Sequence, residues 1–150
     1  MAGAGDPFSL DRYVQAQAPV YEQALVEIRS GRKQSHWMWF IFPQFDGLGL
    51  SATSKHYAIQ SVAEAEAYLS HPILGPRLVE CALALLRLET RTAFDVFGSP
   101  DDMKLRSSAT LFAHVSRDAS VFHRLIERFF HGEPDERTLG LIRDAGKDCA

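Results

Sequence analysis

The aromatic run SHWMWFIFPQ, in the first third of the chain, is the segment most suited to binding chemistry. Trp37, Trp39 and Phe42 could form a flat apolar wall that holds a planar ring. His36 and Gln44 flank this wall and could orient the ring through hydrogen bonds. The same side chains also suit a hydrophobic core in which no ligand takes part. The run therefore allows two interpretations, a ligand pocket and a core segment.

A second candidate site is the block KLRSSATLF, which begins at Lys104. At about 100° per residue, a helix places Lys104 and Ser108 on its apolar arc. Arg106, Ser107 and Thr110 then share the polar arc. An ammonium group near a helix N-terminus opposes the helix dipole, so Lys104 needs a compensating environment. Its stem reaches water, its ammonium pairs with a buried carboxylate, or it holds a ligand phosphate together with hydroxyls that include Ser107 and Ser108.

The common catalytic and cofactor motifs are absent from the sequence. The six histidines include no HExxH pattern and the two cysteines form no pair with metal-ligand spacing, so we predict no bound metal. Neither GxGxxG, nor a phosphate-binding loop, nor GxSxG occurs. We therefore predict no resident cofactor, and a ligand would need a site of another kind.

Charge and composition narrow the class of protein further. Lys and Arg total 16 against 19 for Asp and Glu, a net charge of -3, so no global basic patch attracts nucleic acid or anionic lipid. The longest apolar run, residues 37–42, is far shorter than the roughly 20 residues of a membrane-spanning helix. The N-terminus lacks a basic region followed by an apolar stretch. We therefore predict a cytoplasmic protein without a membrane partner.

Helix signals recur along the chain and predict the elements that must position these residues. Gly31 suits a helix C-terminus, and Asp135 can cap a last helix. Ser61 and Glu64 have the spacing of a capping box. Residues 78–88 are apolar almost all round, which predicts a central helix packed on several sides. The expected fold is mostly α, a compact single-domain multi-helix fold.

The length and the internal boundaries predict one domain. A chain of 150 residues can bury a sufficient core, and no linker or repeat divides it. We expect a single globular domain over residues 8–146 behind a flexible tail of residues 1–7. The aromatic N-terminal segment 37–42 keeps an uncertain local structure, because periodicity does not separate a strand from a helical turn over six residues.

Several blocks together resemble an uncharacterised bacterial family that is often labelled calpastatin. The blocks are SHWMWFIFPQ, GLGLS, YAI, HPILG, KLRSSATLF and GEPDERTL, spread between Phe8 and Ile142. The label suits the sequence poorly, because a disordered inhibitor would be poor in aromatic residues, whereas this chain has a core. The resemblance implies a helical fold and no established reaction.

The chain also resembles, more distantly, the YbiA-like (NADAR) superfamily. The likeness lies in the aromatic N-terminal segment, in His56 and Tyr57 at a helix start, and in alanine-rich helices. It implies chemistry on N-glycosidic bonds of ligands related to NAD or ADP-ribose. Lys55 stands where that superfamily has an acidic residue, and an ammonium cannot replace a carboxylate there. The nearest candidate for the catalytic acid is Asp46, which otherwise serves as a turn residue before Gly47.

Two functions are consistent with these observations. The first is a binder or an N-glycosidase of a nucleotide-like ligand in an aromatic pocket. The second is a protein-interaction or regulatory domain without catalysis. Convergence of Trp37, Gln44 and Lys104 on one concave pocket favours the first, whereas aromatic residues in the core and Lys104 in solvent favour the second.

Overall fold

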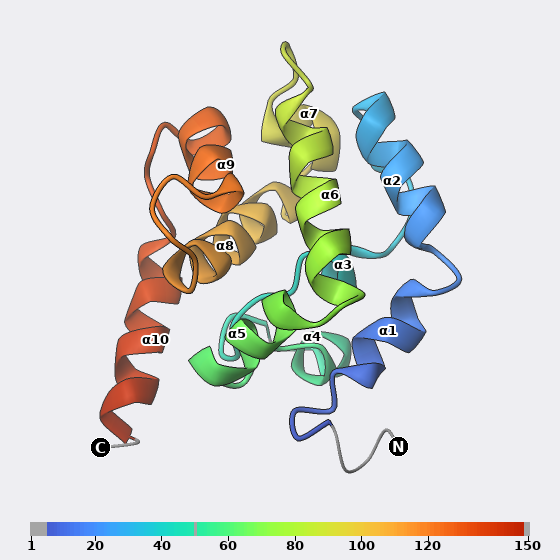
Figure 1. Ribbon diagram of the computed structural model, residues 1–150. Coiled ribbons are helices and arrows are strands. Elements are labelled where there is room, and N and C mark those ends of the chain that lie inside the picture. The colour runs from blue at the N-terminus through green and yellow to red at the C-terminus, as the bar shows by residue number, and fades with distance from the viewer. Residues whose placement is uncertain (1–5, 50, 149–150) are drawn as a thin grey trace.

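Ten α-helices make up the regular structure of residues 6–49 and 51–148, the part of the chain that the computed structural model describes. They form a single compact domain (Figure 1), so the predicted mostly helical fold is confirmed. The helices are α1 (Asp11–Gln17), α2 (Tyr21–Ser30), α3 (Met38–Ile41), α4 (Ala52–His56), α5 (Val62–Ser70), α6 (Leu74–Leu86), α7 (Ala93–Phe97), α8 (Asp101–His114), α9 (Val121–Phe130) and α10 (Glu136–Asp148).

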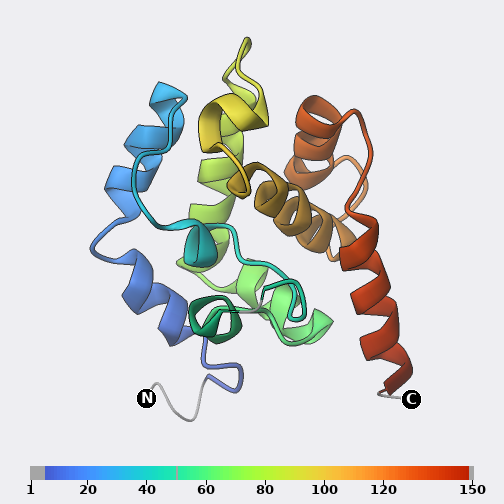
Figure 2. The same cartoon turned by 180° about the vertical axis from the view of Figure 1, so that it is seen from behind.

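Helix α6 runs through the middle of the molecule (Figure 1) and packs against α2, α5 and α9. Its apolar residues face several neighbours at once, which confirms the central helix expected from the sequence. Helix α8 packs against α5, α7, α9 and α10. Seen from behind (Figure 2), α3, α4 and the loop between them lie between α1 on one side and α8 and α10 on the other. The two predicted site segments therefore face each other.

Local capping explains where several helices begin and end. Gly31 adopts the left-handed conformation with φ 79° and ends α2, as expected. The Ser61 hydroxyl accepts the Glu64 N–H and begins α5, but the Glu64 carboxylate accepts the N–H of Gln60 instead of that of Ser61. Asp135 accepts the N–H of Thr138 and caps α10. Each of these contacts spans at most four residues, so the local sequence pattern was sufficient to predict these three helix ends.

The aromatic run forms α3, a single helical turn. In one turn, positions 37, 38, 41 and 42 share a face, and positions 39 and 40 point away from it. Trp37 is fully buried and Phe42 is 2% exposed, and both pack against the ring of Phe97. Trp37 and Phe42 are therefore core residues and do not form the ligand wall that the sequence suggested.

The described part of the chain begins at Asp6. The Asp6 carboxylate accepts the N–H groups of Leu10 and Asp11, at 2.6 and 2.9 Å, and so caps the first turn of α1. The rest of the expected tail, residues 1–5, lies outside the described residues. Within the described part of the chain, no single helix combines the length and the apolar character needed to cross a membrane.

Candidate functional site

A cleft of about 550 Å³ opens where the α3–α4 loop faces the first turns of α8 and α10. It contains five of the residues singled out in the sequence, which are Trp39, Gln44, Asp46, Lys104 and Ser107. They come from two segments about 60 residues apart that the fold places side by side. The other lining residues are Phe45, Gly47, Leu48, Gly49, Ser51, Ser54, Tyr57, Ala58, Pro100, Met103, Asp135 and Arg137.

Lys104 lies at the α8 side of this cleft. Its Nζ is 3.2 Å from a carboxylate oxygen of Asp101 and 4.9 Å from the centre of the Trp39 ring. Asp101 also pairs with Lys33, whose Nζ is 3.0 Å away. Of the three environments considered for Lys104, a carboxylate partner is present, but two lysines share it. Lys33, Lys104 and Asp101 therefore carry a net charge of +1 among themselves.

The hydroxyls of α8 are mostly used inside the protein. Ser107 contacts both the Met103 carbonyl and Asp135, at 3.1 and 3.3 Å, and Thr110 donates to the Arg106 carbonyl. Ser107 and Thr110 are buried, because helices pack around α8 on several sides, so these two hydroxyls of the expected polar arc do not face solvent. Ser107 still reaches the edge of the cleft.

Ser108 lies outside the cleft. Its side chain is buried, and its Oγ has no hydrogen-bond partner among the residues that the structure describes. A buried hydroxyl without a partner costs about 1 to 3 kcal/mol of folding free energy. The expected contact between Ser108 and a ligand in this cleft is therefore not supported by its position.

Asp46 is exposed on the loop side of the cleft. Its backbone N–H donates to Ile59, and the next residue, Gly47, has φ 107°. Asp46 is thus a turn residue before Gly47, which was one interpretation of the sequence. It also lines the cleft, which a role as catalytic acid would require. Within residues 6–49 and 51–148, no other side chain forms a hydrogen bond or an ion pair with its carboxylate. That carboxylate is therefore available to a ligand.

Charged side chains also enter the cleft from α10. Arg137 is exposed and lines the cleft, whereas Asp135 is occupied by Ser107 and Thr138. The cleft therefore contains two cationic side chains, Lys104 and Arg137, and one carboxylate without a protein partner, Asp46. Among the described residues, no group of three or more His, Cys, Asp and Glu side chains is placed to hold a metal ion.

A shallower groove of about 450 Å³ adjoins the cleft. Trp39 and Tyr57 line both hollows. His36, which the sequence suggested as a ligand contact, lines only this groove. The structure thus separates the proposed aromatic pocket into a cleft that contains Gln44 and Lys104 and a groove that contains His36.

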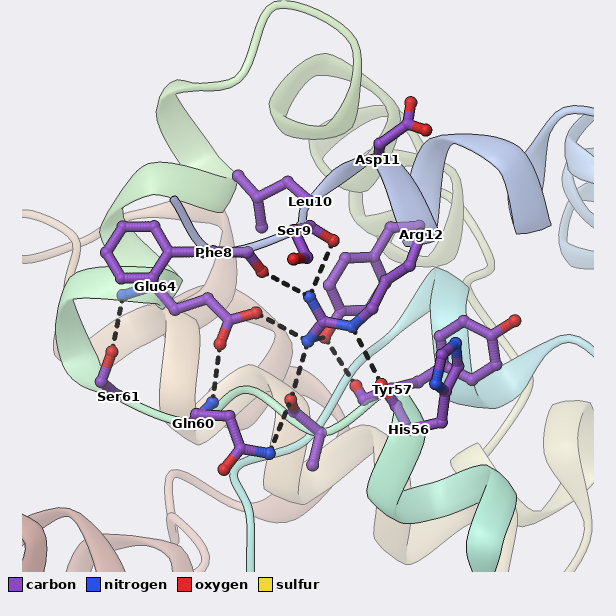
Figure 3. A network of polar contacts seen from close by, with 12 residues as sticks. Phe8, Ser9, Leu10, Asp11, Arg12, His56, Tyr57, Gln60, Ser61 and Glu64 are labelled. Carbon is purple, nitrogen blue, oxygen red and sulfur yellow. Dashed lines mark hydrogen bonds and ion pairs between the residues drawn. The ribbon is translucent and has the colours of Figure 1, made fainter. Parts of the chain in front are cut away.

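Arg12 fixes the wall that carries Tyr57 and Ala58, and its contact with His56 beside Tyr57 is drawn in Figure 3. Its guanidinium donates to six acceptors, which include the carbonyls of His56 and Ala58, at 2.9 and 3.0 Å, and the Glu64 carboxylate at 2.8 Å. The Tyr13 hydroxyl donates to the Tyr57 carbonyl at 2.6 Å. Sequence reasoning missed this network, because the three acceptors that Arg12 reaches across the fold lie 44 to 52 residues away and leave no local pattern. The remaining acceptors are Phe8, Ser9 and Tyr13.

Glu27 positions the segment that leads into α3. Its buried carboxylate accepts the indole N–H of Trp37 at 3.0 Å and the backbone N–H groups of Gln34 and Ser35. Burial alone would raise the pKa of Glu27, but the hydrogen bonds that it accepts outweigh burial and lower the pKa to about 2. The sequence did contain a signal for a buried role of Glu27. Glu27 lies three residues after Ala24 and therefore on the apolar face of α2, where a carboxylate needs partners.

Comparison with known proteins gives a consistent family assignment without an activity. The family model described as "Protein of unknown function (DUF1810)" matches residues 7–142. The crystal structure of the conserved hypothetical protein Rv1873 from Mycobacterium tuberculosis is 48% identical in sequence, with a TM-score of 0.90, and the match covers 92% of this chain and 99% of that one. The search of curated proteins gives no match. These findings support neither the calpastatin label nor a link to the YbiA-like superfamily.

Proposed function

The chain belongs to the DUF1810 family of proteins of unknown function, and we propose that its cleft binds a nucleotide-like small molecule, of the class related to NAD or ADP-ribose. The observation that carries the proposal is the position of Lys104 over Trp39 inside the cleft. An aromatic surface beside a cation is suited to a ligand that joins a planar ring to a phosphate. A cleft of about 550 Å³ lies in the usual size range of small-molecule sites.

Different lining residues would bind different parts of such a ligand. Lys104 and Arg137 would bind the phosphate, because both are cationic and both reach the cleft. The Gln44 amide can donate and accept, and so would read the polar edge of the ring. Trp39 would contact the ring itself. The shared carboxylate of Asp101 leaves Lys104 only partly neutralised, which supports its role as an anion contact.

Replacing Lys104 with methionine should lower ligand affinity without lowering stability. Asp101 keeps Lys33 at 3.0 Å, so the substitution leaves no carboxylate unpaired. Loss of one hydrogen bond from a charged group, worth about 1.5 to 3 kcal/mol, corresponds to roughly 10- to 100-fold weaker binding. Thermal shift and titration calorimetry with NAD, ADP-ribose and mononucleotides measure both quantities.

Lys33→Met is the matched control, because Lys33 pairs with the same carboxylate but does not line the cleft. It should weaken binding less than Lys104→Met does, because the ammonium that lines the cleft stays in place, and it should leave Asp101 paired with Lys104 at 3.2 Å. Equal affinity of the wild type and Lys104→Met, or no thermal shift with any of these compounds, would contradict the proposal. Such a result would favour the alternative function, a protein-interaction or regulatory domain.

Hydrolysis of an N-glycosidic bond is a second candidate, favoured by the free carboxylate of Asp46 in the cleft. A carboxylate there could stabilise the developing oxocarbenium ion or activate water. We expect Asp46→Asn to slow release of the base from a bound nucleotide roughly 100-fold or more, with affinity nearly unchanged. Base release is followed by chromatography. Asp102→Asn is the control, because Asp102 is not among the residues that line the cleft. Equal rates for Asp46→Asn and the wild type would exclude Asp46 from catalysis.

A further inference from the structure

The groove beside the cleft has the composition of a binding surface for a planar ring. Three aromatic side chains line it, Trp39, Phe40 and Tyr57, together with the imidazoles of His36 and His56. No Asp or Glu side chain is among its lining residues, so it does not repel a ligand that carries phosphate. The remaining lining residues belong to the first turn of α4.

The aromatic side chains of this groove are held in place by contacts with one another and by hydrogen bonds to the backbone that carries them. The Phe40 and Tyr57 rings meet edge to face with centroids 5.3 Å apart, and the His56 ring packs on Tyr57 at 4.6 Å. The backbone beneath them is fixed by Arg12 and Tyr13, which donate to the carbonyls of His56 and Tyr57 (Figure 3). A preformed surface needs little ordering when a ligand binds.

Trp39 and Tyr57 connect this groove to the main cleft. Both side chains line both hollows, so a ligand that lies against Trp39 in the cleft can continue into the groove. Lys104 contacts Trp39 from the cleft, which places the cationic contact beside the junction. A ligand with one ring in each hollow would therefore carry its linker past the Lys104 ammonium, which suits a linker that contains phosphate.

We propose that the groove is a second subsite for the same ligand, and that the ligand is a dinucleotide-like molecule with two planar rings joined through phosphate. This inference rests on the proposed binding of a nucleotide-like ligand in the cleft. Stacking of a base on an aromatic side chain contributes about 1 to 3 kcal/mol, so the second ring should strengthen binding roughly 5- to 150-fold. The covalent linker adds to this gain, because the second ring then binds at high effective concentration.

Titration calorimetry with NAD, AMP and NMN tests the proposal, since NAD contains both rings and each mononucleotide contains one. We expect NAD to bind the wild type at least roughly 5-fold more tightly than either mononucleotide. Ala52→Trp, which fills the groove from the exposed start of α4, should lower NAD affinity to the mononucleotide level and leave AMP and NMN binding unchanged. The double variant His36→Ala and His56→Ala should do the same.

Two control variants match these changes. Ala63→Trp adds the same bulk at an exposed position near the start of α5, and His114→Ala removes an exposed imidazole that does not line the groove. Both should bind NAD as the wild type does. Melting temperatures of all variants show whether each remains folded.

The outcomes separate this inference from the proposed function. Equal affinities for NAD and the mononucleotides, all weakened by Lys104→Met, would overturn the second subsite and retain binding in the cleft. Tighter NAD binding that neither Ala52→Trp nor the histidine variant reduces would place the second ring elsewhere and also overturn it. No binding of any of the three compounds to the wild type would overturn both proposals.

Discussion

Replacing Glu27 with alanine is expected to lower the free energy of unfolding by about 4 kcal/mol, because the buried indole N–H of Trp37 and two partly buried backbone N–H groups lose their acceptor together. The indole N–H of Trp37 and the backbone N–H groups of Gln34 and Ser35 all point at this carboxylate. Trp37 is fully buried, so water does not replace the lost hydrogen bond. Urea denaturation at pH 7 measures the loss. Glu22→Ala on the exposed side of α2 is the control and should change stability by less than about 0.5 kcal/mol.

The loss of stability in Glu27→Ala should depend on pH, because the pKa of the Glu27 carboxyl changes on folding. The pKa of Glu27 falls from its ordinary value of 4.5 to about 2 on folding, which corresponds to about 3 kcal/mol of stability. Since the pKa is lower in the folded protein, the contribution is complete above about pH 4.5 and disappears as the pH falls toward 2. The difference between wild type and Glu27→Ala should therefore shrink between pH 4.5 and pH 3. A difference that is equal at pH 7 and pH 3 would contradict this account.

Replacing Arg12 with methionine is expected to lower stability by about 3 to 5 kcal/mol, because it leaves a buried charge without its partner. The Glu64 side chain is 2% exposed, and its Oε2 is 2.8 Å from the Arg12 guanidinium. The substitution also frees the carbonyls of His56 and Ala58, which the same guanidinium ties to the start of α1. Ligand affinity should fall as well, since Tyr57 and Ala58 form a wall of the cleft.

A double-mutant cycle checks the electrostatic part of that loss. Adding Glu64→Gln to Arg12→Met removes the unpaired charge while the Gln60 N–H keeps an acceptor, so the double variant should be more stable than Arg12→Met by about 1 to 2 kcal/mol. Arg117→Met, at an exposed position, is the control and should change stability little. If the double variant is no more stable than the single one, the unpaired Glu64 charge is not the cause of the loss.

Part of the candidate site could be predicted from the sequence. Trp39, Gln44, Lys104 and Ser107 were singled out by residue type and spacing, and Asp46 through the resemblance to the YbiA-like superfamily. The fold brings all five to one cleft. The choice among the aromatic residues required the structure. Whether residues 37–42 form a strand or a helix decides which side chains share a face, and six residues are too few to show a period.

The sequence by itself determined the helical class and the helix ends at Gly31, Ser61 and Asp135. These features depend on contacts within about four residues, so their signals are local. Only the tertiary structure decided that Trp37 joins the core, that Lys33 and Lys104 share Asp101, and that Arg12 pairs with Glu64. Apart from the pair of Lys104 and Asp101, which lie three residues apart in α8, those contacts join segments distant in the chain, and their partners are set by how the helices pack.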